Sequence, residues 1–370
     1  MTPDQIEAAA RGRQAMHGVT LTGTDLRGRV LGGADLAQAK LTGVLAQGAD
    51  LRGARLAGAH LVATSLRGAD LSGCNLQGAE LAGADLTRAN LAGAELRGVD
   101  LAGQRLEMTI LQEADLTGAK LAGATVFMSA LSGARLDGVD LSRAVLRSSS
   151  VDGATLEGVI LERATLRGMD FDGVDVRRLP LRGLTLVKCS FAGANLAGMD
   201  LAGCDLAGSD FADADLRKTR LVGCNLKETS WKGAQLEQAD LSQSQAKGAF
   251  FGDADLRGAK LSQAMLRFAT FSGADLGGAN LAGCDLRETL FVKARARGAT
   301  FTGARMTWAD LSHADLTAAD LGSADLERAN LHHVTDTTTK WPLPTSMATA
   351  KLTDIERLEA EAWVPPTRAR

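Results

Sequence analysis

The amino-acid sequence predicts an all-β solenoid, a parallel β-helix with four sides and a short helix at each end. Three observations predict this fold. An apolar residue, nearly always large and usually leucine, recurs every five residues from Leu21 to Leu331 without an insertion or a deletion. A small residue, usually alanine, stands two positions before nearly all of these central residues. The central residue becomes aromatic at every twentieth position from Phe171 to Phe291.

The period of five fits neither an α-helix nor a flat strand, because those repeat about every 3.6 and 2.0 residues. Two inward residues in every five, small then large, suit a chain that turns a corner after each unit. Four such sides close a coil of twenty residues. With coils stacked at ~4.8 Å, the repeat predicts nearly sixteen coils and a rod roughly 75 Å long. A four-sided helix also stacks the aromatic central residues in one column, whereas a three-sided helix would scatter them. These are Phe171, Phe191, Phe211, Trp231, Phe251, Phe271 and Phe291.

The composition narrows the functional classes. Glycine, alanine and leucine dominate, tyrosine is absent and only six prolines occur, which is typical of tight repetitive packing. A net charge of −3 and a pI of about 6.0 argue against direct nucleic-acid binding. No apolar run is long enough to cross a bilayer, and the N-terminal residues lack a signal-peptide core. We therefore expect a cytoplasmic protein without membrane contact, although secretion by a leaderless route would leave no trace in the sequence.

The repeat units resemble a known family. The sequences ADLRG, ADLSG, ANLAG and ADLGG, at 49–53, 69–73, 194–198 and 274–278, resemble the A(D/N)LxX signature of pentapeptide-repeat proteins. The resemblance covers roughly residues 16–335. It implies a right-handed quadrilateral β-helix in which the central residue and the residue two before it point inward. It implies no single function, because this fold carries several unrelated roles.

The sequence divides into three expected segments. These are an N-terminal capping helix in 1–15, the pentapeptide-repeat β-helix in 16–335, and a C-terminal wrap with a short helix in 336–370. We expect Trp341 to plug the end of the β-helix and a second helix over about residues 353–362. In some proteins that the repeat resembles, a C-terminal extension forms the dimer. The chain is therefore expected to be a monomer, or a dimer through the C-terminal helix.

The N-terminal residues carry helix-start signals. Thr2 and Gln5 form a capping-box pattern, which predicts a helix over about residues 3–13 with Ile6 and a nearby alanine against the first coil. Arg29 breaks the inward pattern in the first full coil. Its guanidinium is expected to reach either this helix or solvent.

The segment 169–184 is the least regular part of the repeat. Pro180 removes a strand donor, and bulky side chains replace the small inward residue at three positions. We expect a local swelling or bend here, and a functional hinge is the alternative. Farther towards the N-terminus, Gln104 occupies a small inward position and needs a backbone hydrogen-bond partner. The three bulky replacements are Met169, Leu179 and Leu184.

Side chains capable of chemistry follow the repeat rather than a catalytic pattern. All five cysteines occupy the small inward position, where a reduced thiol acts as a small apolar side chain. His313, His332 and His333 meet at the C-terminal end, and a metal site there is an alternative to solvated side chains. We assign no catalytic, cofactor-binding or metal-binding residue, and we expect no cofactor and no enzyme activity. The cysteines are Cys74, Cys189, Cys204, Cys224 and Cys284.

The outward positions suggest where a partner binds. The side with the aromatic column carries ten acidic and three basic residues, and the preceding side is the most basic. At the corner between them, large apolar residues occupy outward positions in two clusters, and contiguous exposed apolar surface marks binding sites. The alternative is that these rings cover neighbouring side chains. The predicted partner-binding residues are Met108, Ile110, Phe127 and Met128 in one cluster, and Phe250, Phe268, Leu290 and Trp308 in the other.

These features favour a non-enzymatic protein–protein interaction rod, an adaptor or scaffold whose protein partner is unidentified. The alternative follows from the family resemblance. Some pentapeptide-repeat proteins mimic duplex DNA and bind type II topoisomerases through an acidic surface, which would make this chain a gyrase-directed protein. Residues 286–301 and 309–333 are also similar to repeat proteins that accompany bacterial type VI secretion genes, which implies an accessory role in that system.

Overall fold

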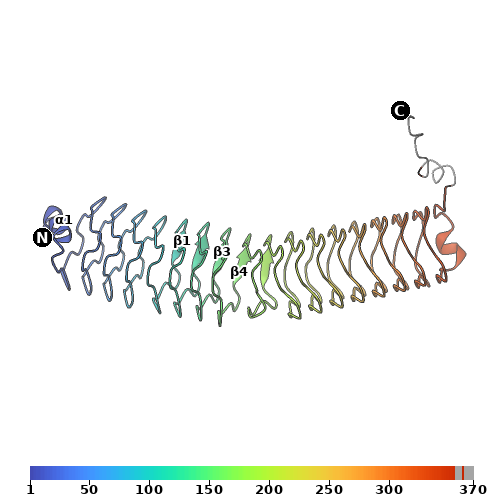
Figure 1. The fold of residues 1–370 in the computed structure, drawn as a ribbon, viewed down its shortest axis with the longest axis horizontal. Coiled ribbons are helices and arrows are strands. Elements are labelled where there is room, and N and C mark those ends of the chain that lie inside the picture. The colour runs from blue at the N-terminus through green and yellow to red at the C-terminus, as the bar shows by residue number, and fades with distance from the viewer. Residues whose placement is uncertain (355–360, 362–370) are drawn as a thin grey trace, which may run out of the picture. The chain divides into compact units, whose positions relative to one another are not determined.

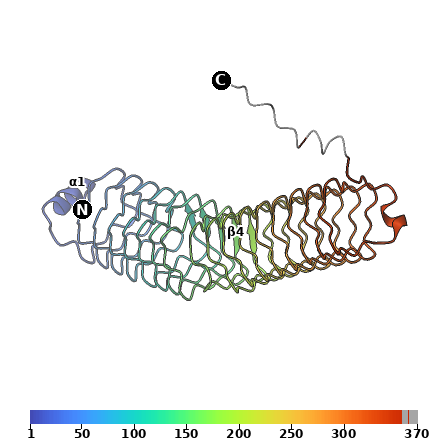
Figure 2. The same ribbon diagram turned by 45° about the vertical axis from the view of Figure 1, so that its right-hand side comes forward.

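The computed structural model describes residues 1–354 and Glu361. It divides into two compact units, Met1–Ser190 and Phe191–Arg370. Each unit is a stack of coils of a right-handed, four-sided parallel β-helix, as predicted (Figures 1 and 2). Parallel bridges join residues twenty apart, such as Asp35 to Arg55, and the next bridge follows five residues later. One coil is therefore twenty residues with four sides.

Each letter of the repeat has a physical role at the corner. The central residue's carbonyl accepts a hydrogen bond from the N–H three residues later, as Leu31 does from Ala34 at 3.1 Å. This turn needs a left-handed residue two positions after the centre, where Gly33 has φ 70°. The Asp or Asn before the centre accepts a hydrogen bond from the N–H two residues later, as Asp70 does from Ser72 at 3.0 Å.

Five short strands form one parallel sheet in the first unit. They are β1 Arg105–Glu107, β2 Thr125–Phe127, β3 Val145–Arg147, β4 Thr165–Arg167 and β5 Thr185–Val187, paired in chain order. Each of the first four pairs with the strand twenty residues later, and Figure 1 labels β1, β3 and β4 in this stack of coils. β-Branched and long side chains suit these three-residue stretches because successive side chains alternate between interior and solvent.

The core of each unit consists of the central and small inward residues, nearly all buried. In the second unit the predicted aromatic column is a stack of nearly parallel rings. Its neighbouring ring centroids are 4.3–5.8 Å apart, and Phe301 meets the last ring edge-on. Gln104 is buried in the first unit, and its side-chain amide donates to the Leu81 carbonyl at 2.5 Å, the backbone partner that we predicted. The stacked rings are Phe191, Phe211, Trp231, Phe251, Phe271 and Phe291.

Helix α1, Pro3–Arg11, lies at the N-terminal end (Figure 1). The predicted capping box is present, since the Thr2 hydroxyl accepts from the Gln5 N–H and the Gln5 side chain accepts from the Thr2 N–H. The helix buries Ile6, Ala9 and Ala10 and ends two residues earlier than expected, at Arg11 followed by Gly12. This arrangement covers the apolar side of a helix that would be marginal alone.

Arg29 reaches helix α1 rather than solvent. Its guanidinium lies 2.7 Å from the Asp4 carboxylate and 2.9 Å from that of Glu7. The hydrogen bond from Arg29 lowers the pKa of Glu7 below its ordinary value. The residue that breaks the inward pattern therefore ties the cap to the first coils.

The C-terminal segment continues the pairing beyond the last repeat. Thr335, Lys340 and Lys351 bridge to the coil below, and the 3-10 helix η1, Pro344–Met347, crosses the end. We expected Trp341 to plug the end of the β-helix. Trp341 is only half-buried, whereas the adjacent Pro342 is buried. The helix expected over 353–362, and a dimer formed through it, fall largely outside the described residues.

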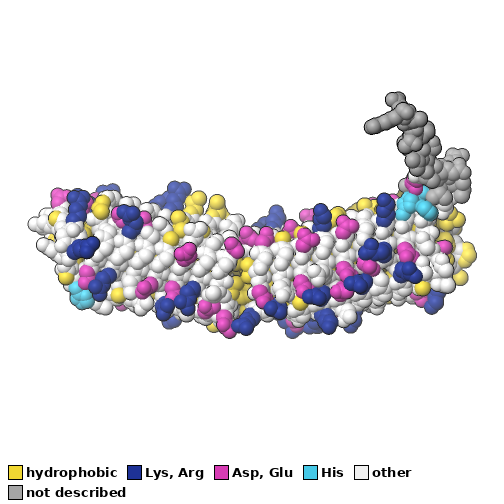
Figure 3. Space-filling model, viewed as in Figure 1, with side chains coloured by type: hydrophobic (Ala, Val, Ile, Leu, Met, Phe, Trp, Pro, Cys, Tyr) yellow, Lys and Arg dark blue, Asp and Glu magenta, His cyan; other side chains and the backbone are white. Residues whose placement is uncertain are grey.

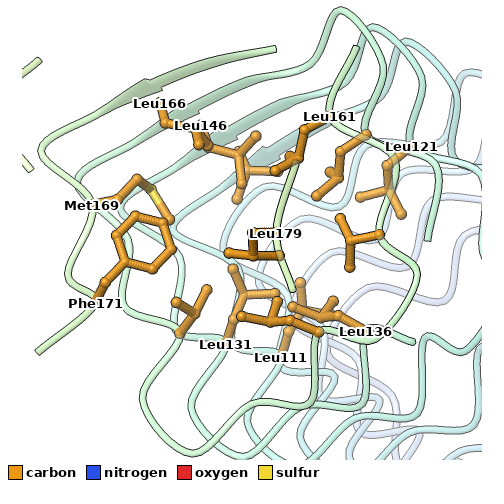
Figure 4. A pocket seen from close by; sticks show the side chains of 15 residues that line it. Leu111, Leu121, Leu131, Leu136, Leu146, Leu161, Leu166, Met169, Phe171 and Leu179 are labelled. Atoms are coloured by element: carbon orange, nitrogen blue, oxygen red, sulfur yellow. The ribbon is translucent and has the colours of Figure 1, made fainter. Parts of the chain in front are cut away.

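The irregular segment of the first unit places large side chains in the interior, where the repeat elsewhere has small ones. The bulky inward side chains Met169 and Leu179 are buried, and Figure 4 shows Leu179 reaching into the middle of the interior. Beside them remains an apolar cavity of about 30 Å³, too small for an organic ligand. A parallel bridge joins Asp140 to Ile160, but Pro180, twenty residues after Ile160, forms no bridge to it. The irregularity is thus a packing adjustment around large side chains and a missing N–H.

Candidate partner-binding surface

The structure places all eight predicted partner-binding residues on the outside, where each is exposed. Four belong to the first unit and four to the second. In each unit they occupy either the outward position before the central residue or the turn after the preceding centre, along one edge of the coils. They are Met108, Ile110, Phe127, Met128, Phe250, Phe268, Leu290 and Trp308.

In the first unit, the cluster is built on the edge of the sheet. Phe127 is the last residue of β2 and Met128 follows it. The Met108 N–H donates to the Phe127 carbonyl at 2.8 Å, which fixes neighbouring coils in register, and Ile110 bridges to Ala130. The sheet therefore holds these side chains in adjacent coils on one rigid edge.

Four of the eight side chains require an unfavourable backbone. Met108, Met128, Phe268 and Trp308 have φ of 53°, 50°, 64° and 64°, in the left-handed region. Glycine fills this turn position in some coils and mainly polar residues fill it in others, and a bulky side chain there costs about 1 kcal/mol or more. Each of the four is at least 41% exposed, so interior packing does not compensate. This combination favours selection for a surface role.

Cations lie against the aromatic rings of the second unit. The Arg267 guanidinium lies 4.5 Å from the Phe268 ring centroid, and the Lys247 ammonium lies 5.5 Å from it. The Arg328 guanidinium lies 4.9 Å from the Trp308 ring centroid. These contacts hold the rings in place and put positive charge beside apolar surface.

Phe250 has a partly structural role. Its ring folds over Gly252, where an added Cβ would lie 2.4 Å from a ring atom. The alternative that rings cover their neighbours therefore applies to Phe250.

Sequence reasoning missed Met265, which is exposed at the outward position before Leu266 and could have been found from the same position rule.

Acidic and basic side chains elsewhere neutralise one another locally. Figure 3 shows the two signs interspersed on the visible face. Hydrogen bonds from Arg27 and Arg177 lower the pKa values of Asp25 and Asp175 to about 2. Many other acidic residues accept a backbone N–H at the corner. The acidic positions therefore reflect turn geometry and local pairing as well as surface charge.

All five cysteines are buried. Desolvation raises the pKa to about 12 for Cys74, Cys224 and Cys284 and to about 11 for Cys189. Thiols in such surroundings are poor nucleophiles at neutral pH. Their location matches the predicted role as small interior side chains.

The histidines at the C-terminal end contact the chain that follows the repeat. Glu361, which the repeat pattern did not predict at this site, places its carboxylate 3.1 Å from His313 Nε2 and 3.4 Å from His332 Nε2. The Asp354 N–H donates to His332 Nδ1 at 3.1 Å, so a neutral His332 carries its proton on Nε2. A metal ligand needs an unprotonated nitrogen. This arrangement therefore fits hydrogen bonding to Glu361 better than coordination of a metal by His332 Nε2.

Comparison with known proteins decides the family. A profile described as Pentapeptide repeats matches eight copies, over residues 21–126, 129–163, 189–228, 234–307 and 309–335. The chain belongs to the pentapeptide-repeat family. The unmatched stretch 164–188 contains the irregular segment. Pentapeptide-repeat proteins are generally structural or interaction proteins, and no catalytic arrangement occurs among the described residues.

Solved structures of the family are similar to this chain. HetL from the cyanobacterium Nostoc sp., a pentapeptide-repeat protein involved in heterocyst differentiation regulation, is 26% identical. The match covers 76% of this chain and 97% of HetL at a TM-score of 0.22. QnrB1, a plasmid-mediated fluoroquinolone resistance protein, is 23% identical over 53% of this chain and 96% of its own at a TM-score of 0.28. TM-scores this low support no conclusion about function.

No curated protein matches the sequence. Among the described residues, no helix combines the length and the apolar character needed to cross a membrane.

Proposed function

We propose that this pentapeptide-repeat protein is a non-enzymatic interaction protein, an adaptor or scaffold that binds a protein partner through its apolar edge. The observation that carries the proposal is the set of exposed Met108, Met128, Phe268 and Trp308 side chains in left-handed turn positions. Exposed apolar surface and backbone strain each have a cost that a purely structural coil avoids with glycine. A partner that buries these side chains offsets that cost.

The test is quantitative affinity purification with the full chain. Phe268→Asp with Trp308→Asp should remove the partner, because two desolvated carboxylates would oppose an apolar contact. Met108→Asp with Met128→Asp asks the same question of the first unit. The matched control is Gln243→Asp with Gln263→Asp, which adds the same charge at exposed turn positions with φ of 59° and 60° on another side.

Mass spectrometry of the captured proteins gives the readout, and circular dichroism checks that each variant folds. Proteins retained by the glutamine control and lost from an apolar-edge variant support the proposal. If every protein captured by the wild type is captured equally by both apolar-edge variants, the proposal is wrong.

A topoisomerase-directed DNA mimic is the second candidate, favoured by the ten acidic residues on the side with the aromatic column. The near balance of 44 acidic and 41 basic residues and the local ion pairs weaken the field that such a mimic needs. A supercoiling assay with gyrase separates the candidates. If micromolar protein neither inhibits gyrase nor protects it, the mimic is excluded and the adaptor remains.

An accessory role in bacterial type VI secretion is a finer proposal for the same adaptor. It is supported only by the resemblance of residues 286–301 and 309–333. Co-purification with a component of such a system, lost in the Phe268→Asp and Trp308→Asp variant, would support it. Retention of the partner by that variant would show that the apolar edge does not mediate this role.

A further inference from the structure

The apolar edge of the second unit carries positive charge that its own carboxylates do not neutralise. Lys227, Lys247, Arg267 and Arg287 occupy the same outward position in four successive coils. Arg267 forms an ion pair of 2.6 Å with Glu288 in the next coil, and Arg287 forms one of 2.6 Å with Asp285, two residues before it. In the described part of the chain, neither lysine has a carboxylate within ion-pair distance, and Lys247 instead lies over the Phe268 ring.

Two of the nearby carboxylates are already engaged, whereas Glu228 beside Lys227 forms no ion pair with any described residue. Asp285 lies 2.6 Å from Arg287 and 3.0 Å from Arg305, and Glu288 lies 2.6 Å from Arg267. These acids therefore have less capacity to attract a lysine from a neighbouring coil. The two lysines remain available to an anionic group that approaches from outside.

The first unit repeats this combination. Phe127 of β2 pairs in register with Arg147 of β3, which pairs with Arg167 of β4. Neither arginine forms an ion pair with any described residue, and Met108 and Met128 lie beside this column. Two separate places thus combine exposed apolar side chains with unneutralised cations one coil away.

We propose that the partner contributes an acidic segment bearing at least one large apolar side chain; this inference rests on the proposed function. The apolar side chain would cover Phe268 or Trp308, while its flanking carboxylates would contact Lys247 and Lys227. The ion pair between a partner carboxylate and a lysine of this edge is strengthened when the ring and the partner's apolar groups exclude water from it.

A single-stranded nucleic acid would also use rings and cations. The edge favours a peptide, because the Arg267 and Arg328 guanidinium groups lie against the Phe268 and Trp308 rings, where bases would have to stack. Nucleic-acid binding is therefore made an outcome of the test.

The experiment selects twelve-residue random peptides on the immobilised full chain by phage display. Peptides that bind the wild type and not the Phe268→Asp and Trp308→Asp variant are sequenced, synthesised and measured by fluorescence anisotropy. Lys227→Gln with Lys247→Gln should weaken binding about tenfold, and added salt should do the same. The control, Lys232→Gln with Lys260→Gln, removes two lysine charges from other sides of the same unit. It should leave affinity within about twofold, since screened distant charges contribute little.

The outcomes separate the two proposals. Enrichment of Asp or Glu together with Leu, Phe or Trp, and the selective loss in the Lys227 and Lys247 variant, support the acidic segment. Peptides that need Phe268 and Trp308 but lack acidic residues would overturn the acidic segment and leave the proposed function standing. If no selected peptide depends on Phe268 and Trp308, the partner surface itself fails. Binding of a dT20 oligonucleotide that is lost in the lysine variant would also overturn the peptide assignment.

Discussion

Ser244 shows how a single inward position can be improved. Its side chain is fully buried, and its hydroxyl oxygen has no hydrogen-bond partner among the described residues. Ser129 occupies the same kind of position, but its hydroxyl donates to the Leu106 carbonyl at 2.7 Å and accepts from the Thr109 N–H. The same residue type is thus unsatisfied at one site and satisfied at the other.

We expect Ser244→Ala to stabilise the protein by about 1 kcal/mol, because it removes a buried unsatisfied oxygen without changing the packing. Ser129→Ala should destabilise by about 1 kcal/mol, because it leaves a buried N–H without its acceptor. Chemical denaturation followed by circular dichroism measures both. A shift of the two midpoints in the same direction would contradict the hydrogen-bond argument.

Because the thiols are buried, we expect them not to react with a thiol reagent in the folded protein. At pH 8, Ellman's reagent should leave the native cysteines unmodified over minutes, because the neutral thiol is favoured and access is blocked. All five should react in denaturant, and Ser323→Cys at an exposed turn should react in the native protein. Fast native reaction in the wild type would show that coils open.

Burial raises the pKa values of Cys74, Cys224 and Cys284. The contribution of these thiols to the free energy of unfolding is therefore present below the ordinary thiol pKa of 9.0 and lost as pH rises towards about 12.

At the scale of one element, the N-terminal helix is held by both packing and charge. Ile6 is buried against the first coils, and Arg29 bonds to Asp4 and Glu7. Without this cap the first coil would expose unpaired strand groups. The break in the repeat at Arg29 is therefore a structural requirement of the end.

Arg29→Met should increase hydrogen exchange in Pro3–Arg11, whereas Arg29→Lys should keep part of the protection. Acid should act in the same direction. The pKa of Glu7 is lowered in the folded state, so its contribution is present above its ordinary pKa of 4.5 and lost as pH falls below it. The control is Arg27→Met, since Arg27 pairs with Asp25 and not with the helix. Equal exchange in the Arg29→Met and Arg27→Met variants would show that the ion pairs do not anchor the helix.

The sequence predicted those elements whose residues follow the period. The β-helix, the aromatic column and the exposed corner residues all depend on position in the repeat, which an unbroken register makes countable, and the capping box follows from the local spacing of Thr2 and Gln5. Trp341 and Glu361 lie beyond the repeat, where no period relates one residue to its neighbours in space. Phe250 was placed correctly on the outside, but the direction of its ring depends on the space that Gly252 leaves. Side-chain rotation and chain paths outside the repeat are therefore what the pattern could not predict.

At the scale of the whole molecule, the twenty-residue coil is the unit that can be removed. Deleting residues 212–231 takes out one complete coil, after which Phe211 would stack on Phe251 and every column would stay in line. Deleting residues 212–216 keeps the small and large inward positions but shifts all later residues by one side. Trp231 would then lie on Leu206, and Phe211 would lie beneath Leu236.

Both deletions keep the five-residue repeat, but only the twenty-residue deletion keeps the aromatic column aligned. Their comparison therefore measures what the alignment contributes to stability. The twenty-residue deletion should fold with a melting midpoint within a few degrees of the wild type, because coils contact mainly their neighbours. The five-residue deletion should melt roughly 5–10 °C lower, because ring and leucine volumes no longer match at the junction. Differential scanning calorimetry measures both, and a second twenty-residue deletion, of residues 232–251, serves as the control for chain length. Equal midpoints for the five- and twenty-residue deletions would show that inward size alone, and not the stacked aromatic column, determines how the coils fit.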